Sequence, residues 1–305
     1  MSNIPGYLVL IAASFFFTGL INRVKAWWTG RKGPPLRQEI FDLRKLLGKS
    51  EVISKTASFV FRLNPSVQIA AAIFAAALVP LPGQSSLIHF PGDFVLFACV
   101  LGLAKFMAIL AALDVGSSFE GMGASREATF SALIEPAFFI LLASLAMITE
   151  QTSFAALFAR LEYGTGTAAL IKGIGAVAFF IMLLVEGSRG PVDDPNTHLE
   201  LTMIHEVMVL DYSGPDLAYI VYASGLKMVL IATLMANMIL PTGAGPLIGA
   251  VLYAGALAVA AAAVGAVESL TARARMSHVP QFIFLMTALS LTAFAVLLFS
   301  LHGGL

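Results

Sequence analysis

The sequence is poor in cysteine and in charged residues. Cys99 is the single cysteine among 305 residues, so the chain cannot form an internal disulfide. An iron–sulfur cluster needs about four cysteine ligands, and we therefore expect any such centre to lie on another chain. Charged residues make up 12% of the sequence, about half of their share in soluble domains. Since the net charge is zero, bulk electrostatics predict no nucleic-acid partner.

Apolar residues are abundant instead, and they form long runs. They make up 58% of the chain. Runs of about 20 apolar residues are long enough to cross a bilayer as helices. We predict an all-α fold: a polytopic membrane protein of eight transmembrane helices that forms a single membrane domain over residues 1–305. The predicted spans are 4–25, 65–82, 93–114, 127–148, 167–186, 216–240, 246–268 and 279–301.

Lysine and arginine are distributed unevenly over the connecting segments. Twelve of the 18 lie after spans one, three, five and seven: Arg31, Lys32, Arg37, Arg44, Lys45, Lys49, Lys55, Arg62, Arg126, Arg189, Arg273 and Arg275. The positive-inside rule places these segments in the cytoplasm and both termini on the extracytoplasmic side of the plasma (inner) membrane. No cleavable signal peptide is expected, because Arg23 and Lys25 follow the first apolar run rather than precede it.

The cytoplasmic segment 30–64 is predicted to contain a short amphipathic helix. After a turn at 30–35, apolar residues recur at helical spacing: Leu36, Ile40, Leu43 and Leu47. Charged residues occupy the other faces, a pattern typical of a helix at the membrane interface. Two roles stay open, a lipid anchor and a docking surface for a cytoplasmic partner. The basic residues assigned to docking are Arg37, Arg44 and Lys45.

Two lysines lie deep inside predicted spans. Lys105 is near the middle of the third span and Lys227 near the middle of the sixth. A charge at that depth costs at least about 2.5–3.5 kcal/mol unless it is paired or hydrated. Both lysines must therefore have partners. They are interpreted either as buried ion pairs that fix the helix register or as part of a hydrated polar axis.

Acidic residues within and at the ends of the spans extend this predicted path. Glu135 lies in the fourth span, directly before Pro136, and proline removes one helical hydrogen bond. A carboxylate beside a freed carbonyl can hold water, so Glu135 is interpreted as a proton carrier; the alternative is a protonated acid that only packs. Asp114 and Glu186 lie at cytoplasmic ends of spans, and Glu186 opens a polar loop.

Two cytoplasmic loops, 115–127 and 187–216, are unusually polar. The first contains several glycines and Arg126, which we assign to partner docking, but its spacing does not match a P-loop. The second collects residues that we assign to partner docking or to the proton path: Arg189, Asp193, Asp194, His198, Glu200, His205, Glu206 and Asp211. No HExxH pattern occurs, so no metal site is predicted, and a cavity that gathers protons fits these residues better.

Three stretches together resemble a known family. They are RKGPP with the following QEIFDLRKLL, GSSFEGMGASREATFSALIEPA, and VEGSRGPVDDPNTHLELTMIHEVMVLDYSGPDLA. This pattern is similar to the NuoH/HycD family, which contains subunit 1 of respiratory complex I and formate hydrogenlyase subunit 4, and it extends over nearly the whole chain. GPP in place of GPN, and the stretch DDPNTHLELTMIHE, resemble the branch with hydrogenase-4 component C and the group 4 membrane-bound nickel–iron hydrogenases.

The resemblance implies a membrane subunit of a multi-subunit oxidoreductase, with no catalytic residue and no cofactor on this chain. Iron–sulfur clusters, and in hydrogenases a nickel–iron site, are expected on partners. Those partners are hydrogenase-like small and large subunits, beside antiporter-like membrane subunits. By motif position Glu135, Glu186 and Glu200 correspond to acids of a proton (or sodium) path. Asp211 stands where the family often has glutamate.

Three alternative functions remain open for this sequence. One is a quinone-site subunit of a complex I-type NADH dehydrogenase, which the departures in the polar loops argue against. Another is a self-contained secondary transporter, which would have two related halves with broken helices in matching positions; the sequence has no clear internal repeat. The last is a purely structural anchor, in which the buried acids have no transport role.

Overall fold

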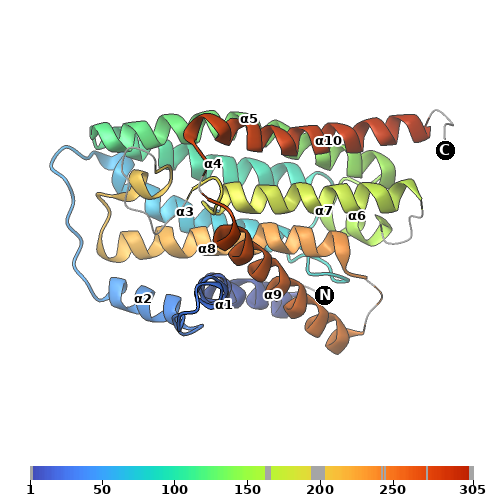
Figure 1. The fold of residues 1–305 in the computed structure, drawn as a ribbon, viewed down its shortest axis with the longest axis horizontal. Helices are drawn as coiled ribbons and strands as arrows, with labels where there is room; N and C mark the ends of the chain where they lie inside the picture. Colours follow the sequence, from blue (N-terminus) through green and yellow to red (C-terminus); the bar gives the residue numbers. More distant parts are fainter. Residues whose placement is uncertain are drawn as a thin grey trace.

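The computed structural model describes residues 3–161, 166–193, 203–241, 243, 245–272 and 274–301. Within these ranges the regular secondary structure is helical throughout (Figure 1). The helices are α1 (Ile4–Trp28), α2 (Gln38–Leu47), α3 (Phe59–Leu78), α4 (Asp93–Asp114), α5 (Ser118–Thr149), α6 (Phe154–Leu161), α7 (Thr167–Glu186), η1 (Glu206–Val209), α8 (Gly214–Ile239), α9 (Pro246–Leu270), η2 (Met276–His278) and α10 (Val279–Leu301).

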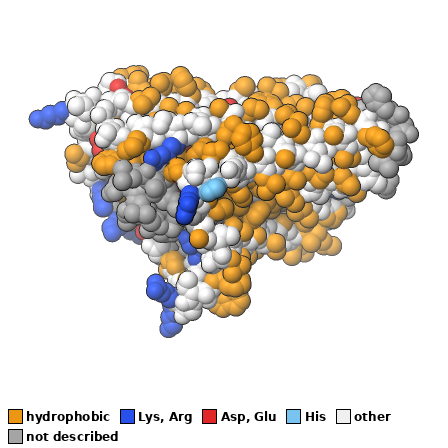
Figure 2. Space-filling view, turned by 45° about the horizontal axis from the view of Figure 1, so that its top comes forward, with side chains coloured by type: hydrophobic (Ala, Val, Ile, Leu, Met, Phe, Trp, Pro, Cys, Tyr) orange, Lys and Arg blue, Asp and Glu red, His pale blue; other side chains and the backbone are white. Residues whose placement is uncertain are grey.

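Eight helices are long and apolar enough to cross a membrane, which confirms the predicted all-α fold. They are α1, α3, α4, α5, α7, α8, α9 and α10. Figure 2 shows hydrophobic side chains along the length of the helices, while lysines and arginines gather toward one end. That end, named the α2 end, carries α2, η1, the segment that joins α1 to α3, and the described residues between α7 and α8 (Figure 1).

The centre of the bundle is α8. In its most apolar window 72% of the residues are buried, and it packs against α7, α3 and α1. α10 packs on α5 and α7, whereas α9 packs mainly on α1 and is inclined to the other long helices (Figure 1). Polar groups carried by α8 and its neighbours therefore lie in the interior of the protein, where a charge needs a partner.

Helix α3 begins at Phe59 and ends at Leu78, rather than running from 65 to 82 as predicted, and it passes through Pro65. Pro65 has no N–H to donate to the carbonyl of Phe61, four residues earlier. The Tyr212 hydroxyl makes that hydrogen bond instead, at 2.8 Å, and accepts one from Asn64 Nδ2 at 3.0 Å. Burial raises the pKa of Tyr212, so its hydroxyl keeps the proton that it donates. The helix therefore continues through a residue that normally interrupts it.

Replacing Tyr212 with phenylalanine tests this substitute hydrogen bond. The Phe61 carbonyl would lose its donor, and we expect the free energy of unfolding to fall by about 1–2 kcal/mol. Thermal unfolding in detergent measures the change. Tyr219→Phe, at a position on α8 that is 36% exposed, is the matched control. Equal unfolding temperatures for the two variants would show that the bond contributes nothing.

The segment 115–127 is not the loop that its glycines predicted, because α5 is helical from Ser118 onward. One of its glycines, Gly123, serves close packing. A side chain at Gly123 would collide with Val207 of η1 and with the backbone of Ile204. Small residues allow another segment to approach a helix in this way. One face of this first part of α5, with Glu120, Gly123, Ala124 and Glu127, therefore lines the interior of the α2 end.

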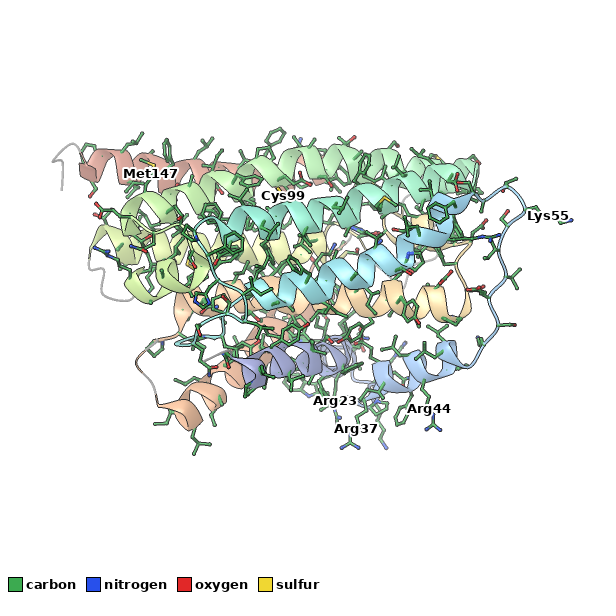
Figure 3. All side chains as sticks on the ribbon, turned by 180° about the vertical axis from the view of Figure 1, so that it is seen from behind. Arg23, Arg37, Arg44, Lys55, Cys99 and Met147 are labelled. Atoms are coloured by element: carbon green, nitrogen blue, oxygen red, sulfur yellow. The ribbon has the colours of Figure 1, made fainter. Side chains whose placement is uncertain are left out.

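The predicted amphipathic helix is present as α2, and it packs against α8 and α1. Leu43 and Glu39 are buried there. Gly19 of α1 admits the carbonyl of Leu36, because any side chain at Gly19 would collide with it. Figure 3 shows Arg37 and Arg44 pointing away from the bundle, beside Arg23 of α1. One face of α2 is therefore part of the protein interior, and the opposite face is free for lipid or a partner.

Candidate functional site

Glu186 is the shared partner of both deep lysines. It is the last residue of α7, and Lys105 of α4 donates a hydrogen bond to its Oε1 at 2.5 Å. Lys227 of α8 donates to Oε2 at 3.0 Å. The Glu186 side chain is only 7% exposed. One carboxylate thus joins three helices, and it explains how two ammonium groups are accommodated so far from either end of their helices.

Further ionisable groups extend this arrangement toward the α2 end. Lys105 Nζ lies 3.7 Å from Glu127 Oε1, and His205 Nε2 lies 3.2 Å from Glu127 Oε2. His205 Nδ1 lies 4.0 Å from Asp193 Oδ2, and that same oxygen accepts the backbone N–H groups of Ile204 and His205. The six connected side chains are named the charge chain: Asp193, His205, Glu127, Lys105, Glu186 and Lys227.

Opposite signs follow one another along the charge chain. Three carboxylates face two ammonium groups and one imidazole, so the chain sums to zero when His205 carries a proton and to −1 when it does not. An isolated charge in this interior would be strongly disfavoured, and alternation of opposite charges offsets part of that penalty. The arrangement can therefore hold one exchangeable proton, and moving that proton changes the field at every other member.

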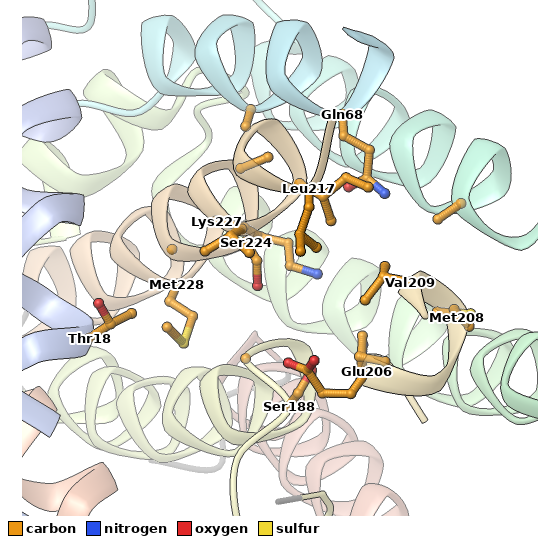
Figure 4. A pocket seen from close by; sticks show the side chains of 18 of the residues that line it. Thr18, Gln68, Ser188, Glu206, Met208, Val209, Leu217, Ser224, Lys227 and Met228 are labelled. Carbon is orange, nitrogen blue, oxygen red and sulfur yellow. The ribbon is translucent and has the colours of Figure 1, made fainter. Parts of the chain in front are cut away.

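A cavity of about 320 Å³, named the chamber, lies against the charge chain. Figure 4 shows Lys227 and Ser224 of α8 reaching into it, with Ser188 and Glu206 on the facing wall. Its other polar lining residues are Thr18, Asn22, Gln38, Glu39, Asp42, Asn64, Gln68, Lys105, Glu127, Arg189 and His205. This volume is large enough for several waters, and the donors and acceptors around it would bind them. The chamber can thus link the charge chain to polar groups on α1, α2 and α3.

Glu135 lies on the outer face of the bundle and not in the buried position predicted for a proton carrier. Its side chain is 48% exposed, and Lys105 Nζ lies 3.9 Å away. A smaller cavity of about 150 Å³ is lined by Glu135, Lys105, Glu186 and Cys99; Figure 3 labels Cys99 on α4. The difference arises because Ile134 and Ala137 lie on the buried face of this helical turn, and Glu135 lies on a different face. Glu135 is therefore the outward-facing neighbour of the charge chain.

A second group of buried charges, named the Glu268 cluster, ties α1 to α9. Lys25 Nζ lies 2.9 Å from Glu268 Oε2, and Arg189 Nη1 lies 3.6 Å from Oε1. The side chains of Glu268 and Arg189 are 3% and 8% exposed. Arg189 stands three residues after Glu186, so one turn carries a member of each group of charges.

The other predicted site residues lie outside the charge chain. Asp114 accepts the N–H of Ser58 at 2.7 Å, which connects the end of α4 to the start of α3. The N–H of Asp211 donates to Glu120 Oε1 at 3.3 Å, and Arg126 donates to the carbonyl of Met203 at 2.8 Å. Arg37, Arg44 and Lys45 are exposed on α2, and Glu206 lines the chamber. Asp194, His198 and Glu200 lie outside the described residues.

The site residues predicted from the sequence do not include Glu127, Glu39, Lys25 or Glu268. Glu120 and Glu127 are seven residues apart, which places both on one helical face, and both are buried. That signal was present but was assigned to a loop. Glu39 precedes the buried Leu43 by four residues, so helical spacing could have placed it on the inner face of α2.

The fold and the site together define a polytopic membrane protein with ionisable side chains linked through its interior. The chain belongs to the NADH dehydrogenase family, whose family model matches residues 3–299. This membership confirms the predicted NuoH/HycD resemblance.

The chain is also similar to individual proteins of known name. The chain is 31% identical over 236 residues to hydrogenase-4 component C of Escherichia coli (strain K12), covering 77% of this chain and 74% of that protein. It is 25% identical over 298 residues to formate hydrogenlyase subunit 4 of the same organism, covering 95% and 96%. A solved structure of the membrane-bound sulfane sulfur reductase, an archaeal respiratory membrane complex, contains a chain with the same fold. The TM-score is 0.78 at 20% identity, with 95% and 96% of the two chains covered.

Proposed function

We propose that this chain is a non-catalytic membrane subunit of a group 4 hydrogenase or formate hydrogenlyase-type complex. In this proposal the charge chain couples redox chemistry in a docked cytoplasmic module to the translocation of protons (or sodium) across the membrane. The observation that carries it is the continuous series of contacts from Asp193, at the α2 end, to Lys227, inside α8. The relatives named above support the type of complex.

The physical basis of the coupling is electrostatic. A redox event that adds or removes charge near Asp193 changes the energy of the exchangeable proton, because each charge of the chain lies within 4.0 Å of the next. Moving one elementary charge against 100 mV requires about 2.3 kcal/mol. The redox reaction in the docked module would supply this free energy, and the charge chain would transmit it.

The proposed orientation places the α2 end in the cytoplasm and both termini outside, following the positive-inside rule. The exposed basic residues of α2 then face hydrogenase-like small and large subunits, which would carry the iron–sulfur clusters and, in a hydrogenase, the nickel–iron site. Glu135 would face an antiporter-like membrane subunit. A half-exposed carboxylate on a membrane-facing surface is costly against lipid alone, so a polar neighbour at Glu135 fits its position.

Replacing Glu135 with glutamine tests the proposed path. Glutamine keeps the size of the side chain and removes its proton-carrying group. We expect the assembled complex in sealed vesicles to keep catalysis with an artificial electron donor and to lose most of its proton translocation. A pH-sensitive dye inside the vesicles measures the translocation.

Glu150→Gln is the matched control for this test. Glu150 is an exposed glutamate that follows the other end of α5, and its replacement should leave translocation at the wild-type level. If the Glu135→Gln complex pumps as well as the control, the assignment of Glu135 to the path is wrong. If transport by the wild type depends on sodium in the medium and not on protons, the transported ion is sodium.

A further inference from the structure

Glu39 is a buried carboxylate that is not part of the charge chain. It lies on α2, and its side chain lines the chamber. The Thr18 hydroxyl of α1 donates a hydrogen bond to Glu39 Oε2. The other oxygen, Oε1, is shielded from solvent and has no hydrogen-bond partner among the residues that the structure describes. A buried carboxylate oxygen of this kind is stabilised by a proton of its own or by water held in the chamber.

Helix α8 leaves room for this carboxylate at Gly225. A methyl group at Gly225 would lie 2.8 Å from Glu39 Oε1, which is too close for a carbon–oxygen contact. The neighbouring residues Ser224 and Lys227 also line the chamber. Glu39 therefore faces the same space as Lys227, the inner end of the charge chain.

Asp42 gives the same wall of the chamber an exposed carboxylate. It stands three residues after Glu39 on α2, is open to solvent, and also lines the chamber. Gln38 Nε2 donates a hydrogen bond to Asp42 Oδ1 at 2.9 Å. Residues three apart are neighbours on a helix surface. Helix α2 thus places a solvent-facing acid next to an enclosed one at the chamber wall.

The surroundings of Glu39 favour proton exchange near neutral pH. Burial raises the pKa of Glu39 to about 7; the positive charge of Arg189 opposes this rise and the negative charge of Asp42 adds to it. Thr18 and Asn22 of α1 line the chamber beside this carboxylate. The other titratable groups that line the chamber from further elements are Lys105, Glu127, Arg189, His205, Glu206 and Lys227. A group with a pKa near the working pH can both accept and release protons readily.

We propose that Glu39 is the carboxylate through which the chamber exchanges protons with the aqueous phase at the α2 end, with Asp42 as its solvent-facing neighbour. This inference rests on the proposed function, since a chain that moves no ions needs no such exchange. It gives the inner face of α2 a role in the ion path, separate from any anchoring or docking by the outer face.

The test compares Glu39→Gln with wild type and with Glu150→Gln in sealed vesicles. The ratio of protons translocated to catalytic turnovers with an artificial donor is measured between pH 6 and pH 8. A positioned proton-transfer group contributes about 10²–10⁴-fold, and bulk water can take over part of the role of Glu39. We expect Glu39→Gln to lower the ratio at least about tenfold and to remove its pH dependence near pH 7. Infrared difference spectra should show a carboxyl band that titrates near pH 7 in wild type and is missing from Glu39→Gln.

The outcomes separate this inference from the proposed function. Suppose that Glu39→Gln translocates as many protons per turnover as wild type, while Glu135→Gln translocates few. That result overturns the role of Glu39 and leaves the proposed function standing. If both variants translocate as many protons per turnover as wild type, the inference on Glu39 and the proposed function are both overturned. If Glu39→Gln does not assemble, Gly225→Ala displaces the carboxylate without removing it, and a wild-type ratio in that variant overturns the inference. A wild-type spectrum without a titrating carboxyl band also overturns it.

Discussion

Replacing Glu186 with glutamine is expected to destabilise the protein by about 3–5 kcal/mol, the range for removing one partner of a buried ion pair. The amide cannot neutralise Lys105 and Lys227, whose ammonium groups lie 2.5 and 3.0 Å from the carboxylate oxygens. Two like charges would then face each other in the interior without a shared counter-ion. Thermal unfolding of the purified protein in detergent measures the loss of stability, and Glu150→Gln serves as the control.

A double variant distinguishes loss of pairing from simple misfolding. In Glu186→Gln combined with Lys105→Met, one negative and one positive charge are removed together, and Lys227 remains as the single uncompensated ammonium group. We expect the double variant to be more stable than Glu186→Gln alone, because neighbouring charges couple by about 0.5–3 kcal/mol. Additive losses would mean that Lys105 and Glu186 contribute independently, contrary to the geometry.

Glu268→Gln is expected to have an effect of similar size in a different part of the fold. Glu268 is the carboxylate shared by Lys25 of α1 and Arg189 of the segment after α7, and its side chain is 3% exposed. Removal of its charge would weaken the attachment of α9, which packs mainly on α1. We expect a loss of about 3–5 kcal/mol in the free energy of unfolding, together with faster protease cleavage between α9 and α10.

The control for Glu268→Gln is Ser269→Ala, its direct neighbour in sequence. Ser269 donates a hydrogen bond to the Gly265 carbonyl of its own helix, so its replacement should change stability by less than about 0.5 kcal/mol. If both variants unfold at the same temperature, the Glu268 cluster does not stabilise the packing of α9 on α1.

The sequence predicted the need for buried ion pairs better than their geometry. The depth of Lys105 and Lys227 was enough to require partners, because burial of an unpaired ammonium group is costly wherever the partner lies. The identity of that partner depends on how α4, α7 and α8 pack, and one sequence does not contain this information. Glu186 was included in the proton path, but nothing in its spacing showed that it would be shared by both lysines.

The errors of the sequence-based interpretation have local causes. The glycines of segment 115–127 predict a loop, whereas Gly123 lets η1 approach a helix closely, and the loop prediction conceals Glu127. Glu135 was expected to be buried because it lies well inside an apolar span, but depth along a helix does not determine which face a residue occupies. For α2 the amphipathic pattern was correct, and the charged residue on its inner side went unnoticed because apolar positions alone defined the face.

The short turn after α7 joins the two groups of buried charges mechanically. The N–H of Gly187 donates to the Leu183 carbonyl and that of Arg189 to the Leu184 carbonyl, so Glu186 and Arg189 belong to one hydrogen-bonded turn. A partner subunit that binds the segment beyond this turn and shifts it would move both residues together. A displacement of this turn would therefore change two contacts together: the contact of Glu186 with Lys105 and Lys227, and the contact of Arg189 with Glu268.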